Sequence, residues 1–485
     1  MKITLRLFLS AATIIAISTH CKREEKTITI GIVSPTDFTE EDVEIYKVYL
    51  YKEENGSDKI LNSFTIQKKD NFAINVDNIP EKIKISLKGF NKKNRVIAQA
   101  ESDYFSSNEN IKILLGNVNN FQEVSFLPEL PSLPSVLYSK KNEKIFIIGG
   151  LYSGNATGTV YIISLKTLNW VEKNITIPRW DFSPIELPNG DIIIAGGNNG
   201  KTSIPDVEIL KENGFSEIVG KLSTPRQNYQ AFLWEDFVIF IGGKTITEYN
   251  NSLSESALST CEFYNLKDKR FSGEFRCMPS PRFNFQMEII EKGTILSKIL
   301  IIGGKDEKGN TLPIGKIRLY NRFDYIDTVF SEIKMKKPRY GHRVFKIEDK
   351  VYITGGIDSQ GNVLQDTEIL YPDENSTVSG PSLNTPRTDF CISSYEVVPG
   401  LEYFIVYGGY SDTEKKSYSD DVEIFEQSDF KRVNNYETGI RIKMKNPLSS
   451  FFCQTVLNIY LYNFGGDKTT RPSVFIPNYI GLDFF

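Results

Sequence analysis

A short apolar segment that ends in two glycines recurs seven times along the chain. An uninterrupted apolar run of this kind is typical of a strand that is buried on both faces. The glycines carry no Cβ, so they let the chain turn where neighbouring units crowd. The repeat is about 50 residues long, and its first glycines are Gly149, Gly196, Gly242, Gly303, Gly355, Gly408 and Gly465. Most of the chain must therefore fold as a repetitive array of short strands.

Each repeat carries two further strand signals after its glycine pair. A fourth strand is marked by an aromatic residue such as Trp170, Phe215 or Phe271. The third strands are expected at 160–165, 207–210, 261–264, 317–320, 367–371, 422–425 and 474–477. Four short strands in each of seven repeats predict an all-β fold, a seven-bladed β-propeller over residues 119–485.

Closing such a ring requires an outer strand for the last blade, which lacks one of its own. The segment 120–127 precedes the first repeat and is one candidate for that strand. The tail 479–485 is the competing candidate. Either solution leaves only short, protected sheet edges.

A proline, usually followed by arginine, precedes each glycine pair, from Pro134-Ser135 in the first repeat to Pro447-Leu448 in the seventh. The second residue of the third strand is usually glutamate. The arginine and the glutamate are both present or both absent in six of the seven blades. We therefore predict structural, buried ion pairs within blades. They join Arg179 to Glu208, Arg226 to Glu262, Arg339 to Glu368, and Arg387 to Glu423.

Blade four is the exception, because Arg282 is matched there with Arg318. Arg282 then faces an anionic ligand or another carboxylate. The alternative is that the repeat is misaligned at this point. Both interpretations stay open at the level of the sequence.

The chain contains only two histidines, His20 and His342. His342 lies four residues after a proline, where the other repeats carry an aromatic residue such as Phe285 or Phe390. We expect it to pack in the core rather than to act in catalysis. One histidine in the exported chain excludes multi-histidine metal sites. We assign no catalytic residue, no metal and no other cofactor.

Residues 1–21 begin with two positive charges and continue with an apolar run that is too short to span a bilayer. The run ends at Cys21, so the segment resembles a bacterial lipoprotein signal peptide, which implies lipid modification of Cys21. His20 departs from the small residue that this family has before the cysteine, and simple secretion is the alternative. Because Lys22 follows, we expect attachment to the outer membrane of the bacterial envelope.

Residues 22–118 lack the glycine repeat and alternate in hydrophobicity over short segments. Six such segments in about ninety residues predict a small antiparallel β-sandwich of immunoglobulin-like or prealbumin-like type. No cluster of chemically active residues marks this region. We expect it to be a stalk between the lipid and the propeller.

Four cysteines follow Cys21. Cys261 and Cys277 flank two adjacent predicted strands, and an exported protein permits disulfides, so these two can face each other. Cys391 and Cys453 are expected to be small buried side chains without that chemistry.

The glycine pairs, the Pro-Arg column and segments such as Val207-Glu208-Ile209 resemble bacterial kelch-repeat proteins, including those with a galactose-oxidase-like central domain. The resemblance covers about residues 120–485 and implies the fold more than the function. Galactose oxidase needs a copper site with two histidines, so that activity is excluded. The resemblance leaves metal-free sugar-acid mutarotases or isomerases as an alternative, and a purely structural scaffold as another.

The formal net charge of -4 argues against a nucleic-acid partner. We expect a monomeric binding module for a protein or a glycan. Loops that follow the glycine pairs vary in composition, as binding loops do; the longest is the polar segment 244–259. A column that includes Asn228, Asn284 and Asp389 has the alternative role of bonding backbone turns. The candidate ligand-binding residues are Trp180, Asn198, Asn199, Asn228, Arg282, Asn284, Tyr340, Asp389, Tyr410 and Asp467.

Overall fold

The protein is described from a computed structural model. The described residues are 2–6, 13–21, 24–34, 38, 42–54, 57–67, 75–77, 80–106, 111–118, 121–124, 127–321, 326–371, 373–398, 401–426, 431–432, 453–456, 460–463 and 473–475. Every regular element among them is a β-strand. None of them belongs to a helix long and apolar enough to cross a membrane.

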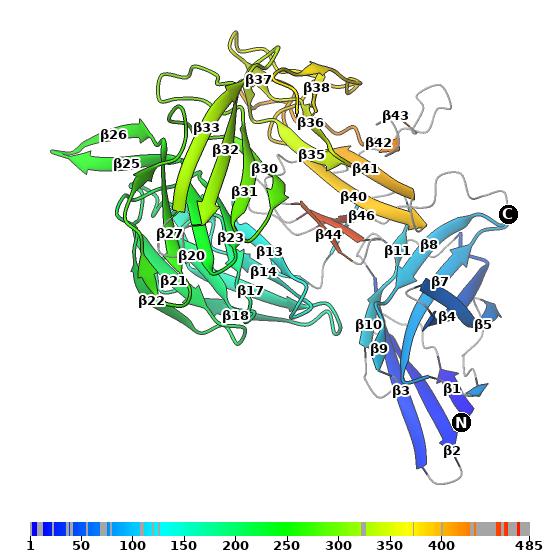
Figure 1. The fold of residues 1–485 in the computed structure, drawn as a ribbon. Helices are drawn as coiled ribbons and strands as arrows, with labels where there is room; N and C mark the ends of the chain where they lie inside the picture. The colour runs from blue at the N-terminus through cyan, green and yellow to red at the C-terminus, as the bar shows by residue number, and fades with distance from the viewer. Residues whose placement is uncertain are drawn as a thin grey trace.

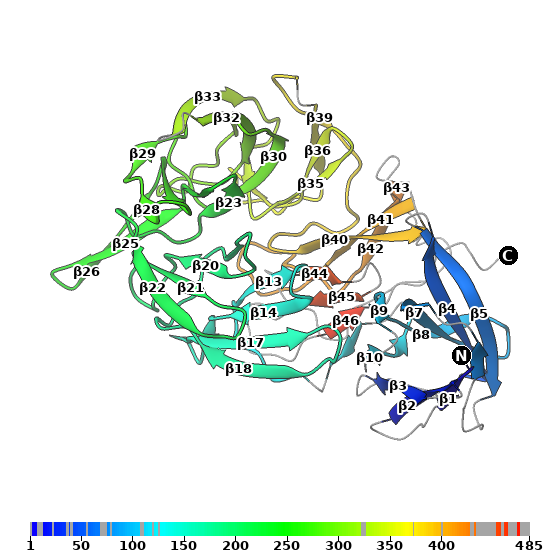
Figure 2. The same cartoon turned by 60° about the horizontal axis from the view of Figure 1, so that its bottom comes forward.

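Seven sheets surround a common centre, as Figures 1 and 2 show. Their innermost strands contact one another in chain order, from blade to blade. We number the blades by their glycine pairs. Blade one contains β13 (Ser135–Ser139), β14 (Lys144–Ile148), β17 (Thr159–Ser164) and β18 (Trp170–Asn174). Blade two contains β19 (Ile185–Glu186), β20 (Ile192–Ala195), β21 (Asp206–Leu210) and β22 (Ser216–Lys221). Blade three contains β23 (Gln230–Trp234), β24 (Phe237–Ile241), β27 (Thr260–Asn265), β28 (Arg270–Phe271) and β29 (Phe275–Arg276). The predicted all-β propeller is confirmed.

The remaining blades repeat this order. They contain β30 (Gln286–Lys292), β31 (Leu296–Ile302), β32 (Ile314–Asn321) and β33 (Ile326–Ile333); β35 (Arg343–Ile347), β36 (Lys350–Thr354), β38 (Thr367–Leu370) and β39 (Val378–Ser379); β40 (Cys391–Val398), β41 (Leu401–Tyr407), β42 (Glu423–Glu426) and β43 (Lys431–Arg432); β44 (Cys453–Val456), β45 (Tyr460–Asn463), β46 (Ser473–Phe475) and β12 (Phe121–Glu123). Among the described strands, three two-stranded sheets are separate from the blades. They are β15 (Leu151–Tyr152) with β16 (Asn155–Ala156), β25 (Lys244–Tyr249) with β26 (Ser252–Ala257), and β34 (Arg339–Tyr340) with β37 (Ile357–Asp358).

The ring is closed by a strand from before the first repeat. β12 pairs antiparallel with β46, so that Phe121 lies opposite Phe475 and Glu123 opposite Ser473. The seventh sheet therefore joins the beginning and the end of the propeller. This is the solution predicted for the segment 120–127, whereas the competing tail 479–485 lies outside the described residues.

The two glycines of each pair lie close to different neighbouring segments. A Cβ on Gly196 would lie 2.3 Å from the carbonyl oxygen of Arg226 in the next blade. A Cβ on Gly197 would lie 2.7 Å from the carbonyl oxygen of Trp180 in the same blade. The Gly197 N–H also donates a hydrogen bond of 2.9 Å to the Arg226 carbonyl oxygen, which links blade two to blade three. The crowding predicted at the glycine pairs is confirmed and has both an inter-blade and an intra-blade component.

All four predicted ion pairs are formed inside single blades. The distances between the arginine Nη2 and glutamate Oε1 atoms are 2.5 Å for Arg179–Glu208, 2.9 Å for Arg226–Glu262, 2.7 Å for Arg339–Glu368 and 3.0 Å for Arg387–Glu423. The side chains are almost completely buried. In each pair the arginine Nη1 also donates to the carbonyl oxygen of the first glycine of its own blade. The pairs therefore tie the Pro-Arg segment to the sheet.

The alignment of blade four with Arg318 is wrong. Glu208 lies opposite Ile194 in blade two, and the equivalent position opposite Ile301 in blade four is Gly315. Arg318 is exposed. Gly303 and Gly315 are as far apart along the chain as Gly196 and Glu208, so the connection is not longer. The apparent shift of three residues arises because β32 is a long strand, Ile314–Asn321, whose second half resembles the third strands of the other blades.

The first repeat was also misaligned. Ser132 forms the β-bridge with Leu151 that Trp180 forms with Asn198 in blade two. Pro131, not Ser135, therefore takes the arginine position of blade one. Three positions after Pro131, Pro134 takes the place of the packed aromatic side chain, which is Phe182 in blade two.

The N-terminal region forms two sheets. One has the order β10-β3-β2-β1-β6 and the other β11-β8-β7-β4-β5, with β9 paired to β7. The strands are β1 (Lys2–Arg6), β2 (Thr13–Cys21), β3 (Glu24–Val33), β4 (Ile45–Glu54), β5 (Ser57–Gln67), β6 (Asn75–Asp77), β7 (Lys82–Phe90), β8 (Val96–Glu101), β9 (Phe105–Ser106), β10 (Ile111–Leu114) and β11 (Gly116–Asn117).

Side chains from both N-terminal sheets share one hydrophobic cluster, which includes Ile32 on β3, Val48 on β4 and Ile113 on β10. Among the described side chains, this cluster draws only on residues 32–115. The predicted leader 1–21 contributes β1 and β2 to the first sheet but no described side chain to the cluster. The immunoglobulin-like or prealbumin-like topology and the role as a stalk stay predictions.

Candidate functional site

A cavity of about 420 Å³ lies among the innermost strands of the propeller. Five successive blades place the same residue of the repeat, two positions after the arginine, on its wall. These residues are Asp181, Asn228, Asn284, Gly341 and Asp389. All five have a positive φ, between 51° and 65°. Asparagine, aspartate and glycine are the residues that adopt this conformation most readily, which explains why the column contains only these three types.

A second cavity of about 320 Å³ shares Asp181, Asn228 and Asn284 with the axial cavity. We call it the mouth. Its remaining lining consists of aromatic, basic, amide and aliphatic side chains, namely Trp180, Phe283, Lys244, Lys415, Gln227 and Leu133. The two cavities adjoin at the shared column, so a ligand in the mouth has access to the axial wall.

The shared column also stabilises the turns that carry it. Asn228 Nδ2 donates a 3.1 Å hydrogen bond to Asp181 Oδ1, and the Asn284 backbone N–H donates a 2.6 Å bond to Asn228 Oδ1. In blade six the Asp389 backbone N–H donates to the Gly341 carbonyl oxygen. These residues therefore bond backbone turns, as the alternative interpretation proposed, and they line the cavities as well.

The axial cavity carries three charged groups. Burial raises the pKa of the Asp181 carboxyl, although hydrogen bonds from Asn228 and Gln227 act in the opposite direction. Burial lowers the pKa of the Arg343 guanidinium, and the charge of Asp389 opposes that shift. The wall thus offers two carboxyl groups and one guanidinium to a bound molecule, and burial penalises the charged forms of Asp181 and Arg343.

Four of the predicted ligand-binding residues line the cavities: Trp180, Asn228, Asn284 and Asp389. The Trp180 indole Nε1 is buried and has no hydrogen-bond partner among the described residues. A buried indole N–H usually finds a partner. Because Trp180 also lines the mouth, it is the strongest candidate among the predicted residues for contact with a ligand.

Two predicted asparagines serve the scaffold instead. Asn198 is buried and its Nδ2 donates a 2.7 Å hydrogen bond to Gln227 Oε1. Asn199 is exposed and its Oδ1 accepts hydrogen bonds from the backbone of its own turn, at Lys201 and Thr202. Neither lines the two cavities.

Two predicted tyrosines line neither of the two cavities. The Tyr340 ring contacts Lys305, whose Nζ lies 4.4 Å from the ring centroid. Tyr410 is buried and stacks on Tyr418, with ring centroids 4.9 Å apart. Asp467, the last of the candidates, lies outside the described residues.

Arg282 does not reach the mouth, and its assignment as a ligand-facing residue is wrong. The side chain is completely buried. Its Nη1 donates to the carbonyl oxygens of Gly303, at 3.0 Å, and Pro313, at 2.6 Å, and its Nη2 donates to Ser280 Oγ at 2.6 Å. Burial lowers the pKa of the guanidinium to about 10. Arg282 thus keeps the scaffold contacts of the arginine column without the glutamate.

The segment 244–259, predicted to be a polar loop, is mostly a β-hairpin. β25 and β26 pair over six positions and project from the ring in Figure 1. The hairpin is held to blade two, where the Ser203 N–H donates to the Ile246 carbonyl oxygen and the Ile246 N–H donates to Ser203 Oγ. Its first residue, Lys244, lies in the mouth, so the hairpin extends one wall of the site outward.

Sequence reasoning missed several residues of the site. Asp181 shares a repeat column with Asn228, Asn284 and Asp389, so the column itself contained the signal. Lys244 follows a glycine pair directly, the same repeat position as Asn198 in blade two. Arg343 and Lys415 had no such signal, because they reach the cavities through their length and the curvature of the ring.

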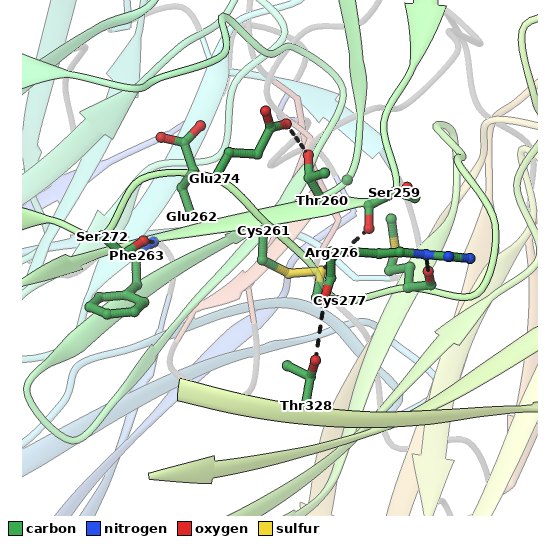
Figure 3. The surroundings of a disulfide bond; sticks show 12 residues. Ser259, Thr260, Cys261, Glu262, Phe263, Ser272, Glu274, Arg276, Cys277 and Thr328 are labelled. Atoms are coloured by element: carbon green, nitrogen blue, oxygen red, sulfur yellow. Dashed lines mark hydrogen bonds between the residues drawn. A yellow bond between two sulfur atoms is a disulfide. The ribbon is translucent and has the colours of Figure 1, made fainter. Parts of the chain in front are cut away.

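The predicted disulfide between Cys261 and Cys277 is formed in blade three, as Figure 3 shows. β29 pairs with β27, which brings Cys261 opposite Phe275 and close to Cys277. Cys391 is also disulfide-bonded, so the expectation of a simple buried thiol there is wrong. The side chain of Cys453 lies outside the described part of the chain.

Within the described residues, no group of three or more histidine, cysteine, aspartate or glutamate side chains is arranged to hold a metal ion. No protein-family model matches the chain, and no curated protein matches it. The kelch resemblance therefore stays a resemblance, while the seven-bladed propeller is established by the sheets themselves.

Proposed function

We propose that this protein is a binding module of the bacterial envelope and that its propeller binds a glycan or protein partner at the mouth. The observation that carries this proposal is the pair of adjoining cavities, which share Asp181, Asn228 and Asn284. Cavities of about 420 and 320 Å³ fall within the size range of small-ligand sites. A propeller with such an axial opening suits the end of a chain molecule better than a flat protein surface.

The composition of the walls favours a saccharide over an apolar ligand. Amide side chains such as Asn228 and Asn284 both donate and accept hydrogen bonds, which matches sugar hydroxyls. Trp180 provides an aromatic surface at the same opening. Together they supply the stacking and the hydrogen bonding that a sugar ring requires.

The envelope location rests on Cys21 and on the apolar segment before it. Lipidation at Cys21 would hold the protein at the membrane, with the outer membrane as the proposed site and a monomer as the proposed state. The disulfide between Cys261 and Cys277 supports an oxidising compartment, because such bonds are rare in the bacterial cytosol.

A metal-free sugar-acid isomerase or mutarotase is the second candidate function. Asp181, Asp389 and Arg343 open onto the same axial cavity, and burial raises the pKa of Asp181. A buried carboxyl group with a raised pKa suits proton transfer to or from a substrate, and an arginine suits a substrate carboxylate. A purely structural scaffold is the third candidate, and it makes no use of these groups.

Binding to an array of glycans, peptides and envelope proteins tests the proposal, with the full-length chain kept in detergent. Trp180→Ala is expected to abolish the saturable binding. Trp170→Ala is the matched control, because Trp170 lies on the outer strand β18, away from the mouth. A hit that both variants retain would place the ligand elsewhere, and the absence of any hit from the folded protein would contradict the proposal.

Catalysis is tested separately by following the anomeric equilibration of sugar acids by NMR in the presence of the protein. Acceleration that Asp181→Asn removes, with ligand binding retained, would favour the isomerase or mutarotase. Unchanged equilibration rates in the presence of a bound sugar acid would leave binding as the function.

A further inference from the structure

Three lysines converge on the mouth from different parts of the ring. Lys244 and Lys305 are the residues that directly follow the glycine pairs of blades three and four, so they occupy equivalent positions in neighbouring blades. Lys415 arrives from the connection between β41 and β42 in blade six. We call Lys244, Lys305 and Lys415 the lysine cluster. Two of its members line the mouth itself.

Aromatic rings lie against all three of these ammonium groups, and Lys415 Nζ is 5.6 Å from the centroid of the Tyr410 ring. Lys305 Nζ lies 4.4 Å from the centroid of the Tyr340 ring and 5.5 Å from that of Phe283. Lys244 Nζ lies 4.9 Å from the centroid of the same Phe283 ring, from the neighbouring blade. These are cation–π distances, which stabilise a positive charge without neutralising it. The rings therefore fix positive charge at the opening.

Carboxylates neutralise two members of the cluster. Lys244 Nζ lies 2.8 Å from Glu255 Oε2 on the hairpin, and Lys415 Nζ lies 2.7 Å from Asp389 Oδ2. No ion pair involves Lys305 among the residues that the structure describes. Burial lowers the pKa of the Lys305 ammonium, and the charges of Lys244 and Lys415 lower it further, while the charges of Glu255 and Asp389 act in the opposite direction. An anion beside Lys305 would relieve both effects.

We infer that the mouth selects saccharides that carry a negative charge, and that the ammonium of Lys305 is the group that binds the anion. The inference rests on the proposed function, because it assigns the charge of the ligand that the propeller would bind. Carboxylate and sulfate share the required chemistry, since each is an anion with several acceptor oxygens. An acidic peptide is disfavoured because the mouth is small and continues into the amide-lined axial cavity.

Matched pairs of oligosaccharides test this inference. One pair is a glucuronic-acid-terminated oligosaccharide and its carboxyl-reduced counterpart, and the other is a galactose oligosaccharide with and without sulfate. Their affinities are measured by titration calorimetry with the full-length chain in detergent, at low and at high salt. The variant is Lys305→Gln. The control is Lys308→Gln, which removes an exposed lysine three residues away in the same connection.

We expect at least one charged sugar to bind about tenfold more tightly than its neutral partner, the gain expected from one charge-assisted hydrogen bond. Lys305→Gln should remove that difference, Lys308→Gln should keep it, and added salt should reduce it. The two pairs distinguish carboxylate from sulfate as the preferred anion.

The outcomes separate this inference from the function on which it rests. Equal affinities within both pairs, or a preference for charge that Lys305→Gln leaves intact, would overturn the role of Lys305 while the mouth remains a saccharide site. Binding of an acidic peptide in place of every sugar would overturn the choice of ligand class. A folded protein that binds no saccharide would overturn the proposed glycan function and this inference with it.

Discussion

The guanidinium Nη2 of Arg226 lies 2.9 Å from Oε1 of Glu262, and neither side chain is exposed to solvent. The same carboxylate accepts hydrogen bonds from the backbone N–H groups of Ser223 and Thr224. The glutamate is therefore surrounded by donors from the segment that precedes the Pro-Arg pair. Burying a carboxylate in this way is tolerated only while all of its hydrogen-bond and ion-pair partners are present.

Arg226→Met should destabilise the protein by about 3–5 kcal/mol, because it leaves the Glu262 carboxylate buried without its cation. Arg282→Met is the control, since it removes an equally buried arginine that has no paired glutamate. We expect the control to cost less, as it leaves no carboxylate alone. Urea unfolding of the two variants checks this prediction, and equal losses would mean that the arginine hydrogen bonds to backbone carbonyls dominate.

Gly303→Ala should disrupt the contact between blades four and five. A Cβ there would lie 2.2 Å from the carbonyl oxygen of Arg339, and φ is +62°. Gly361→Ala is the matched control, because φ is +84° and no atom lies within 4 Å of the added Cβ. The control should lose only the backbone cost of about 1–2 kcal/mol. Thermal unfolding compares them, and similar losses would refute the inter-blade role of the glycine.

The stability of the protein should fall as the pH drops below about 6.5, the ordinary pKa of histidine. Burial lowers the pKa of His342 well below that value, and the charges of Arg339 and Arg343 lower it further. The unfolded chain then binds a proton that the folded chain does not, so acid favours unfolding.

His342→Phe tests this prediction with the residue that other repeats carry at this position. The variant should be more stable than the parent protein at pH 5, by up to about 2 kcal/mol, and nearly unchanged at pH 8. Urea unfolding at both pH values gives the comparison. A constant difference between variant and parent across this range would show that His342 does not titrate on unfolding.

Removal of the disulfide in blade three should destabilise the protein. The bond joins residues 16 positions apart, and closing a loop of this size contributes about 3 kcal/mol in the chain-entropy account. The double variant Cys261→Ala/Cys277→Ala should lose about this amount in unfolding without reductant. Reductant added to the variant then reports the bond at Cys391 alone. No loss in the double variant would show that blade three is held by its packing.

The fold was predictable because its determinants recur at short, regular spacing. Gly196 and Gly197 meet the same neighbours as their counterparts in other blades, so one blade predicts the next. The buried pairs followed from covariation within a single chain, as with Arg387 and Glu423. Close packing between blades requires glycine at the same repeat position, and a buried arginine requires a glutamate, so both requirements recur in the sequence.

The error in blade four arises from the length of a strand. β32 continues as far as Asn321, and its second half aligned Arg318 with the glutamate column, although Gly315 occupies that position. A Cβ on Gly315 would lie 3.4 Å from Cδ of Pro279. Pro279 fills the space that the glutamate side chain occupies in other blades. It also has no backbone N–H to donate to a glutamate, so the loss of the glutamate and the presence of the proline compensate each other.

The site was harder to predict than the fold, because it is assembled from residues that share no pattern. Asp181 belonged to a visible column, whereas Lys415 reaches the mouth from a blade three places away from that of Lys244. The convergence of such side chains follows from the curvature of the ring. The spacing of residues in a sequence does not encode that curvature.

The pairing of β12 with β46 also sets an order of events in time. A chain that is synthesised from its N-terminus contains β12 more than three hundred residues before its partner strand β46. Throughout that interval the closing strand has no sheet to join, and the ring stays open. Completion of the propeller must therefore wait for the last repeat, and a chain truncated before β46 would leave both β12 and β45 without the strand that pairs with them.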